Sequence, residues 1–524
     1  MFPGLNLAQW LTLHGLVTLL AVLFYVITSH LMHQRRHPSA AIAWILFILL
    51  MPYVALPIFL TFGSRKLARP RAMLQLQPAL GNDALPWAVQ TLQALGQPAP
   101  DAYRELDIHV DGHAATLALW RVIDAAQQSI DVCTFILGRD RLGGAVIDRL
   151  CVKAAAGVRV RVLLDGLGSL MAGRPDLRRL RAAGALCTLF VPPLHSPLKG
   201  RTNLRNHRKL LITDGALETR RLWCGGRNLA SAYFEGEPGR PPWIDLSFDL
   251  CGPVVRQATA LFEHDWAFAG GAATAAVATP PAFNHAHRAA PTHRADGAAM
   301  GGAAPSGAAP RDTAKRDTAA RDTTTLDTTT LDAAKRGTEK RDAASATALA
   351  QLVASGPDQV DDTLYALLVS AAFRARRRIS LASPYFVPDG ALTMALALAA
   401  RRGVVVDLLL PARSNHPLSD FARSRALRVL SAAGVRVWLT TQMLHAKLVV
   451  VDDSLALAGS ANLDSRSMFL NYELMLAFHE PADVERFASW FGPQRLSAHR
   501  YAARRPGLLR DMLEGMILWL GFQL

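Results

Sequence analysis

The sequence contains few cysteines, and their spacing does not suggest pairs. Only five of the 524 residues are cysteine, and no two of them are spaced as C-x-x-C. An odd and dispersed set argues against a disulfide framework and against a structural zinc site. Neither H-E-x-x-H nor a paired Cys/His cluster occurs. We therefore expect free thiols buried in a reducing compartment, and we predict no metal or other cofactor. The cysteines are Cys133, Cys151, Cys187, Cys224 and Cys251.

The first ten residues lack lysine and arginine, which argues against a signal peptide. Two apolar runs follow, over residues 11–31 and 40–62, and the second holds no formal charge. As a helix, that second run is about 35 Å long, enough to cross a hydrocarbon core of about 30 Å. We therefore predict two transmembrane helices within residues 1–70. A buried helical hairpin in a soluble core is the alternative.

Positive charge exceeds negative charge, with 57 Lys and Arg against 42 Asp and Glu. The excess indicates an anionic partner: nucleic acid, an acidic membrane surface or a phosphate-bearing substrate. Four basic residues follow the second apolar run, whereas Arg35 and Arg36 lie between the runs. By the positive-inside rule, this bias favours a cytoplasmic main body.

Residues 271–348 contain very few large apolar side chains. Among Leu, Ile, Val and the aromatic residues, only Val277, Phe283, Leu326 and Leu331 occur there. So little apolar surface cannot offset the entropy lost on ordering, so we expect a disordered linker or insertion.

The two remaining blocks, residues 71–270 and 349–524, resemble each other. Residues 125–137 parallel 371–387, and residues 154–165 parallel 398–411, each as a helix that leads into a β-branched run. The offset between matching positions drifts gradually, which is typical of a duplication with small insertions. We therefore predict two α/β layered halves that form a pseudo-dimer. An amphipathic tail ends the second half, and it either lies on a membrane interface or packs against the body.

Both halves carry the pattern H-x-K-x-x-x-x-D followed by G-x-x-N. A β-branched run follows each histidine, which places H-x-K on a strand, with imidazole and ammonium on one face. Imidazole can attack phosphorus or protonate a leaving oxygen, while lysine and asparagine can hold phosphate oxygens. Two such motifs supply a nucleophile and an acid on opposite sides of one phosphorus. The residues are His207, Lys209, Asp214 and Asn228 in the first half, and His445, Lys447, Asp452 and Asn462 in the second.

With these duplicated motifs, the sequence resembles the phospholipase D superfamily, and within it the bacterial cardiolipin synthases. The N-terminal apolar pair, SPYFVPDG (383–390) and GSANLDSRSMFLNYE (459–473) carry the closer likeness. The resemblance implies a duplicated α/β sandwich and a two-step displacement through a phosphohistidine, without a metal.

The resemblance also implies the role of each site residue. His207 is assigned as nucleophile and His445 as acid/base, with the reverse assignment left open. The two lysines and the two asparagines would bind the phosphate. A carboxylate usually holds the far ring nitrogen of each histidine; Glu473 matches that position in the second half, and Asp245 matches it in the first. The motif aspartates are expected to be structural.

The implied activity is transfer of a phosphatidyl group between two phosphatidylglycerol molecules, giving cardiolipin and glycerol. The implied location is the bacterial inner membrane, as a multi-pass protein, with anionic phospholipid and not nucleic acid as partner. A hydrolytic phospholipase D, or a synthase that uses another donor, remains an alternative. A nuclease of the same superfamily would explain the positive charge but not the two N-terminal apolar runs. A catalytically silent membrane scaffold is a further alternative, but it would not require an intact H-x-K motif in both halves. The sequence leaves the oligomeric state open.

Overall fold

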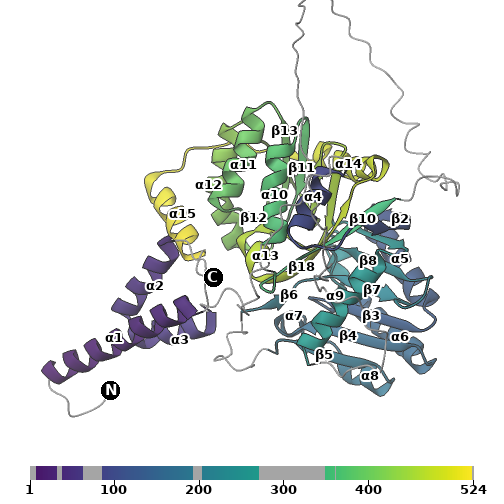
Figure 1. The fold of residues 1–524 in the computed structure, drawn as a ribbon, viewed down its shortest axis with the longest axis horizontal. Helices are drawn as coiled ribbons and strands as arrows, with labels where there is room; N and C mark the ends of the chain where they lie inside the picture. Colours follow the sequence, from purple (N-terminus) through teal and green to yellow (C-terminus); the bar gives the residue numbers. More distant parts are fainter. Residues whose placement is uncertain are drawn as a thin grey trace, which may run out of the picture. The chain divides into compact units, whose positions relative to one another are not determined.

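The computed structural model of the chain describes residues 7–31, 38–62, 85–192, 203–270, 348–359 and 362–521. The linker predicted over 271–348 lies outside the described residues, except for Ala348. The described residues all belong to one unit of the chain. Figure 1 shows this unit with many of its helices and strands labelled.

Seven strands form the sheet of the first half, in the order β2-β9-β8-β7-β3-β4-β5. Strands β3, β4 and β5 are parallel to one another, and the remaining pairs are antiparallel. Both faces of β3 and β4 are buried, which requires cover on each side of the sheet. The strands are β2 (Arg104–His109), β3 (Ser129–Thr134), β4 (Arg159–Asp165), β5 (Leu186–Phe190), β7 (Leu210–Thr213), β8 (Arg221–Gly225) and β9 (Ser247–Cys251).

Helices supply that cover on both faces of the first sheet. One face packs against α5 (Gly112–Ala125), α6 (Arg141–Ala155) and α8 (Leu177–Ala182) in one apolar cluster. The other face packs against α9 (Val255–Phe268), whose buried side chains belong to a different cluster. The alternation of strands and helices therefore builds a layered α/β half.

The second half repeats this topology in a larger sheet, in the order β1-β10-β18-β16-β15-β11-β13-β14-β19. Strands β11, β13 and β14 are parallel, as β3, β4 and β5 are, and the hairpin β15–β16 corresponds to β7–β8. The predicted duplication is therefore confirmed. The strands are β10 (Leu349–Ser355), β11 (Arg378–Ala382), β13 (Val405–Pro411), β14 (Arg436–Thr440), β15 (Leu448–Val451), β16 (Leu455–Gly459), β18 (Asn471–Phe478) and β19 (His499–Arg500).

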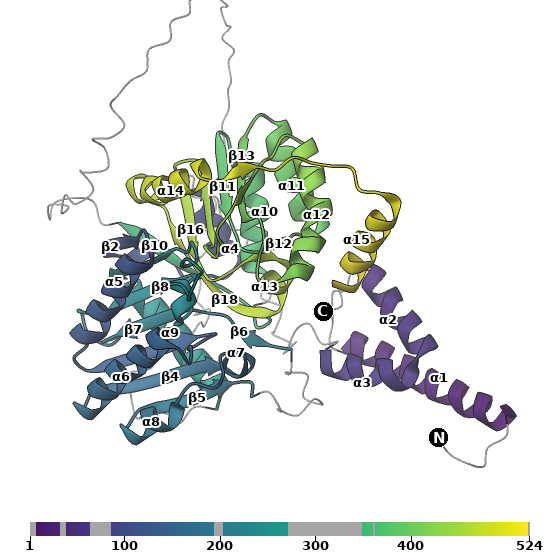
Figure 2. The same cartoon turned by 180° about the vertical axis from the view of Figure 1, so that it is seen from behind.

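The two halves share one central apolar core. Helices α10 (Thr363–Arg374), α11 (Gly390–Arg401) and α12 (Pro417–Ala432) lie together on one side of the second sheet (Figures 1 and 2). The other side packs against α14 (Pro481–Leu496), in the same cluster as α9. Within it, the Phe248 ring of the first half lies 5.5 Å from Phe478 and 6.0 Å from Phe487 of the second.

A short segment that the sequence placed in the first half, 71–270, belongs to the second sheet. Strand β1 (Asp101–Ala102) pairs with β10, and α4 (Trp87–Ala94) packs on α10 through Ala88 and Leu92. The outer edge of β10 would otherwise expose unpaired backbone groups, which β1 covers. Helix α4 and strand β1 therefore pack with the second half, although they precede the first half in sequence.

The second N-terminal apolar run forms two helices instead of one. After α1 (Leu7–Leu31), the chain forms α2 (Pro38–Leu50) and α3 (Pro52–Phe62), with a break at Met51. Pro52 has no N–H to donate back into α2, so it begins a new helix. Among the described helices, none combines the length and the apolar character needed to span a bilayer.

Helices α1 to α3 expose many large apolar side chains. Ala21, Tyr25, Trp44 and Phe59 pack into a small core of their own. Contiguous exposed apolar surface of this kind marks an interaction site with a membrane or a protein. The exposed side chains include Leu11, Leu16, Leu19, Leu20, Leu23, Phe24, Ile42 and Leu46.

Candidate active site

The two H-x-K motifs occupy extended segments that precede equivalent strands. His207 and Lys209 come directly before β7, and His445 and Lys447 come directly before β15. The prediction placed these motifs on the strands, whereas each strand begins one residue after the lysine. Extended backbone still directs alternate side chains to one side. The histidine and lysine of each motif therefore stay neighbours.

Each motif pairs with backbone from the opposite half. Strand β6 (Arg205–Asn206) is parallel to β18, and the His207 N–H donates to the carbonyl of Tyr472 at 2.9 Å. Equivalently, Ile244 and Leu444 form a parallel bridge, and the His445 N–H donates to the Ile244 carbonyl at 2.7 Å. This reciprocal pairing brings the two motifs together at the junction of the halves.

Each histidine consequently meets the carboxylate of the other half. His207 Nδ1 lies 3.0 Å from Glu473 Oε1, and His445 Nδ1 lies 2.7 Å from Asp245 Oδ2. The sequence assigned one carboxylate to each half, and the structure places each carboxylate beside the histidine of the other half. Each carboxylate follows a residue whose backbone pairs across the junction, so its side chain also reaches across.

The carboxylates fix which ring nitrogen of each histidine carries the proton. A carboxylate accepts from Nδ1–H, so a neutral imidazole keeps its lone pair on Nε2. Glu473 is itself held by the Ser460 hydroxyl, which donates to Oε2 at 2.6 Å. Both imidazoles are therefore oriented for attack or proton transfer through Nε2.

The two lysines lie against their histidines. Lys209 Nζ donates to the His207 carbonyl at 2.6 Å. Lys447 Nζ lies 2.9 and 3.0 Å from the two ring nitrogens of His445 and donates to the His445 carbonyl at 2.5 Å. Each ammonium is almost completely buried. Two buried cations beside two histidines suit an anionic substrate.

The two predicted asparagines are also buried, but their bonding differs. Asn228 Nδ2 donates to the Tyr233 hydroxyl at 2.8 Å, and its Oδ1 accepts from the Ile136 N–H at 3.2 Å. Asn462 is 4% exposed, and its Oδ1 has no hydrogen-bond partner among the described residues. A buried polar atom without a partner is costly. Asn462 is therefore the side chain with spare bonding capacity.

Burial dominates the electrostatics of the site. It lowers the pKa of His207 to about 4 and that of His445 to about 3, and Lys447 adds to the effect at His445. It also lowers the pKa of Lys209 to about 8 and that of Lys447 to about 7. With these pKa values both imidazoles are neutral at pH 7, as a nucleophile requires.

The carboxylates carry the negative charge of the site. Burial alone would raise the pKa of Asp245 and of Glu473, but attraction to the paired histidine and to the nearby lysine holds both below their usual range. Both carboxylates therefore remain ionised and can stabilise an imidazolium.

The motif aspartates lie apart from this chemistry. Asp214 accepts hydrogen bonds from the backbone N–H groups of residues 127, 128 and 129, where β3 begins. Asp452 accepts from residues 376, 377 and 378, where β11 begins. Both aspartates have a φ of 51°. Their bonds join the end of β7 or β15 to the neighbouring strand of the same half.

Two protein-family models match the chain. The family model described as "Cardiolipin synthase, PLD-like domain" matches residues 119–266 and 368–495, one match in each half. The model "Phospholipase_D-nuclease N-terminal" matches residues 17–64. The chain belongs to the cardiolipin synthase family of phospholipase D-like proteins.

Individual members of the cardiolipin synthase family match over most of their length. Cardiolipin synthase A of Pseudomonas putida (strain W619) is 30% identical over 483 residues, which cover 88% of this chain and 87% of that protein. The protein of the same name from Pseudomonas aeruginosa (strain LESB58) is 30% identical over 476 residues, covering 87% and 84%.

A solved structure shares the fold of this cardiolipin synthase family member. The crystal structure of phosphatidylserine synthase from Haemophilus influenzae Rd KW20 matches with a TM-score of 0.53 and 13% identity. The match covers 83% of this chain and 98% of that one. At this identity the likeness concerns the fold alone.

Three aromatic side chains line the histidines, and sequence reasoning missed their place in the site. The Phe135 ring lies 5.2 Å from His207, while Tyr233 and Trp243 lie 4.9 and 5.5 Å from His445. Trp243 and Tyr233 stand close in sequence to Asp245 and Asn228, which was the available signal. Their rings limit the space around each imidazole.

Among the described residues, one group has the spacing to share a metal ion: Asp107, His109 and Asp249. Arg121 and Arg221 already donate to Asp249, and His109 Nε2 lies 2.9 Å from its Oδ2. These two arginines supply the positive charge that a cation would bring. The group is therefore a satisfied ion-pair network in this family member.

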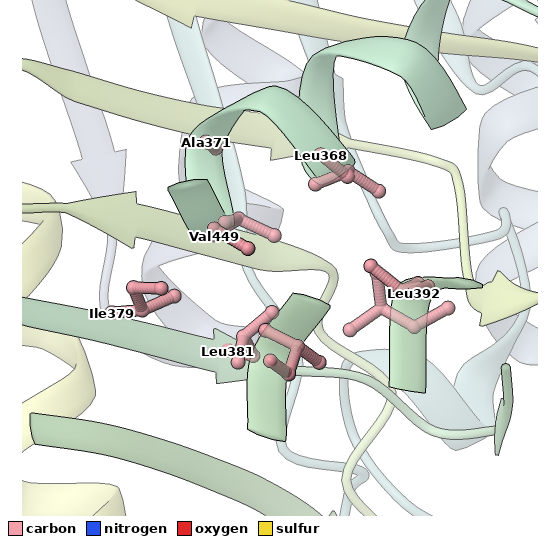
Figure 3. Close-up of a pocket in the computed structure, with 9 residues that line it drawn as sticks. Leu368, Ala371, Ile379, Leu381, Leu392 and Val449 are labelled. Atoms are coloured by element: carbon pink, nitrogen blue, oxygen red, sulfur yellow. The ribbon is translucent and has the colours of Figure 1, made fainter. Parts of the chain in front are cut away.

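A small cavity lies in the core of the second half and not at the histidines (Figure 3). Leu368 and Ala371 on α10, Leu392 on α11, Ile379 and Leu381 on β11, and Val449 on β15 line it. All its lining residues are apolar. The cavity is a gap in the packing of the core, and none of the side chains that line it could take part in catalysis.

Proposed function

We propose that the chain is a cardiolipin synthase that transfers a phosphatidyl group between two phosphatidylglycerol molecules. The observation that carries this proposal is the pair of crossed histidine–carboxylate contacts between the halves. It supplies two imidazoles with defined tautomers beside two buried lysines, the set required for a two-step displacement at phosphorus.

In the first step, Nε2 of His207 attacks the phosphorus of the donor lipid. An N–P bond forms and the bond from phosphorus to the glycerol oxygen breaks, while His445 gives its proton to that oxygen. Glycerol leaves, and a phosphohistidine remains. In the second step, His445 accepts the proton of the acceptor's hydroxyl, whose oxygen attacks phosphorus and displaces His207 to give cardiolipin.

The remaining polar groups stabilise charge during both steps. Lys209, Lys447, Asn228 and Asn462 bind the non-bridging oxygens of the phosphate. His445 needs a proton for the first step, although burial lowers its pKa to about 3. The negative phosphodiester raises that pKa when it binds, as a nearby opposite charge does. Substrate binding thus favours the protonated form of His445, which acts as the acid in the first step.

Two related functions use the same site. Water as acceptor would make the chain a hydrolytic phospholipase D, and a different donor would make it another kind of cardiolipin synthase. The reversed roles of His207 and His445 also satisfy the pseudo-twofold geometry. The relatives named cardiolipin synthase A favour transfer over hydrolysis.

Incubating the purified full-length chain with labelled phosphatidylglycerol tests the proposal. We expect cardiolipin and glycerol as products, and phosphatidic acid as the main product would contradict it. His207→Ala and His445→Ala should each abolish turnover, while His113→Ala, at an exposed position on α5, should not. Mapping the trapped phosphohistidine by mass spectrometry identifies the nucleophile.

We also infer that helices α1 to α3 anchor the chain in the bacterial inner membrane, with the catalytic halves on the cytoplasmic side. The exposed apolar side chains of these helices and the N-terminal family match support this inference. Membranes washed with alkaline carbonate should retain the full-length chain. Release into the wash would contradict an integral anchor and leave only a peripheral association.

A further inference from the structure

Arg205 lies on β6, close in sequence to the reactive histidine. It precedes His207 by two residues in extended backbone, so the two side chains share one side of the segment. The alternate residues Asn206 and Arg208 face the opposite way, because both donate to the carboxylate of Asp265. Arg205 therefore points to the same side as His207 and Lys209.

The guanidinium of Arg205 is poorly satisfied within the described residues. Its Nη1 donates to the Leu204 carbonyl at 2.6 Å, but its buried Nε has no hydrogen-bond partner. It forms no ion pair with any described carboxylate. Burial accordingly lowers the pKa of Arg205, with only Asp165 opposing the effect. A partly buried cation with an unsatisfied donor fits an anionic ligand.

A second arginine approaches from the other half. Arg466 lies on α13 (Ser465–Phe469), and its Nη2 donates to both the carbonyl and the Oδ1 of Asn203, each at 3.1 Å. Burial lowers the pKa of Arg466, and the charge of Arg205 lowers it further. The two guanidinium groups are thus close enough to repel each other, which a bound anion would offset.

The carboxylates whose charge acts on these arginines, Asp165 and Asp464, also accept hydrogen bonds from backbone N–H groups. Asp165 accepts from the backbone N–H groups of residues 167 and 168 with one oxygen, and from that of Asn206 with the other. Asp464 accepts from the Ser467 N–H at the start of α13. Both therefore serve as helix caps and leave Arg205 without a direct carboxylate contact.

The second half lacks an equivalent of Arg205. Leu444 pairs with Ile244 as Asn206 pairs with Tyr472, so Met443 occupies the position that corresponds to Arg205. The site is therefore asymmetric around the two histidines, with a cation on the His207 side and an apolar side chain on the His445 side. An asymmetric site suits a reaction whose two lipids play different roles.

We propose that Arg205, together with Arg466, binds the phosphodiester of the acceptor lipid. This inference rests on the proposed function, in which the acceptor is a second phosphatidylglycerol. Such an acceptor carries its own phosphate on the glycerol that bears the attacking hydroxyl. A guanidinium offers paired N–H donors that match phosphate oxygens. The two arginines would thereby orient that hydroxyl and favour the anionic lipid over water.

Two reactions of the full-length enzyme separate the acceptor site from the histidines. Cardiolipin formation from phosphatidylglycerol needs the acceptor phosphate, whereas exchange of labelled glycerol into phosphatidylglycerol uses a neutral acceptor in the same phosphohistidine cycle. We expect Arg205→Met, which copies Met443, to lower the ratio of cardiolipin formation to glycerol exchange about tenfold, the effect of losing one charged hydrogen bond. Arg205→Lys should lower the ratio less.

Arg178→Met is the matched control, because Arg178 is exposed on α8 of the same half. It should leave the ratio at the wild-type value. A ratio for Arg205→Met within twofold of wild type would overturn the proposal, as would an equal loss in the control. Should Arg205→Met fail to fold, the ratio measured for Arg205→Lys decides in the same way. Failure of the wild type to form cardiolipin would instead refute the proposed function.

Discussion

At the residue scale, each histidine depends on a carboxylate that is distant in the chain. Glu473 lies 266 positions from His207, and Asp245 lies 200 positions from His445. In the proposed mechanism, each carboxylate fixes a tautomer and stabilises the imidazolium that forms during turnover. We therefore expect Glu473→Gln and Asp245→Asn to lower kcat by about 10²- to 10⁴-fold, the usual contribution of general acid–base catalysis. Initial rates at saturating phosphatidylglycerol measure this.

The control for these variants is Asp453→Asn, a neutralised carboxylate at an exposed ion pair with Arg377. It should retain the wild-type kcat. The trapped phosphohistidine adds a second readout, because Glu473→Gln and Asp245→Asn affect different histidines. Should both variants turn over at the wild-type rate, the crossed contacts would have no part in catalysis.

The lowered histidine pKa values predict how stability depends on pH. The pKa of His207 falls from 6.5 to about 4 in the folded chain, so the unfolded state binds more protons between these values. Stability must therefore fall as the pH falls from about 6.5 to about 4. At 1.36 kcal/mol per pKa unit, His207 alone accounts for about 3 kcal/mol.

His207→Asn removes this titration while it keeps a polar side chain of similar size. We expect the variant to lose less unfolding free energy than the wild type between pH 7 and pH 4, in urea titrations of the detergent-solubilised chain. Exposed His113→Asn serves as the control, with the wild-type pH dependence. If the unfolding free energy of all three proteins changed equally with pH, His207 would not be held neutral by burial.

At the scale of elements, Arg208 connects segments of both halves. Its buried guanidinium pairs with Asp265 on α9 and donates to the carbonyl of Glu473 on β18 at 3.1 Å. Removing one partner of a buried ion pair leaves the other charge uncompensated. We therefore expect Arg208→Met to destabilise the chain by about 3–5 kcal/mol in urea unfolding.

A double-mutant cycle separates this ion pair from general packing loss. Arg208→Met combined with Asp265→Asn leaves no unpaired buried charge, so the double variant should be more stable than the sum of the two single effects predicts. Strict additivity would mean that Arg208 and Asp265 contribute independently, contrary to their contact.

Local sequence patterns predicted most of the helices and strands. They did not predict the contacts between segments that are distant in the chain. The β-branched runs after Gly157 and Gly403 predicted β4 and β13, which are buried along nearly their whole length. The crossed pairing depends on two contacts between the halves, β6 with β18 for Glu473 and Ile244 with Leu444 for Asp245, and no local pattern encodes either contact. The second apolar run was predicted as one helix, whereas Pro52, which lacks an N–H, begins a second helix there.

At the scale of the whole molecule, the two halves are joined by more than the chain between them. The central core contains α9 of the first half and α14 of the second, and β6 pairs with β18 across the junction. Strand β1 precedes the first sheet in sequence but pairs within the second. Each half therefore contributes groups that complete the other.

This interdependence predicts that the chain tolerates a cut between its halves. A protease recognition sequence inserted among the Arg-Asp-Thr repeats at residues 311–332 lies in a stretch poor in large apolar side chains. After cleavage we expect cardiolipin formation to stay within about twofold of the uncut enzyme, as polar connecting segments usually tolerate nicking. Size-exclusion chromatography in detergent should elute both fragments together. Fragments that separate, or activity that vanishes on cleavage, would show that the crossed contacts and shared core cannot hold the halves together without the linker.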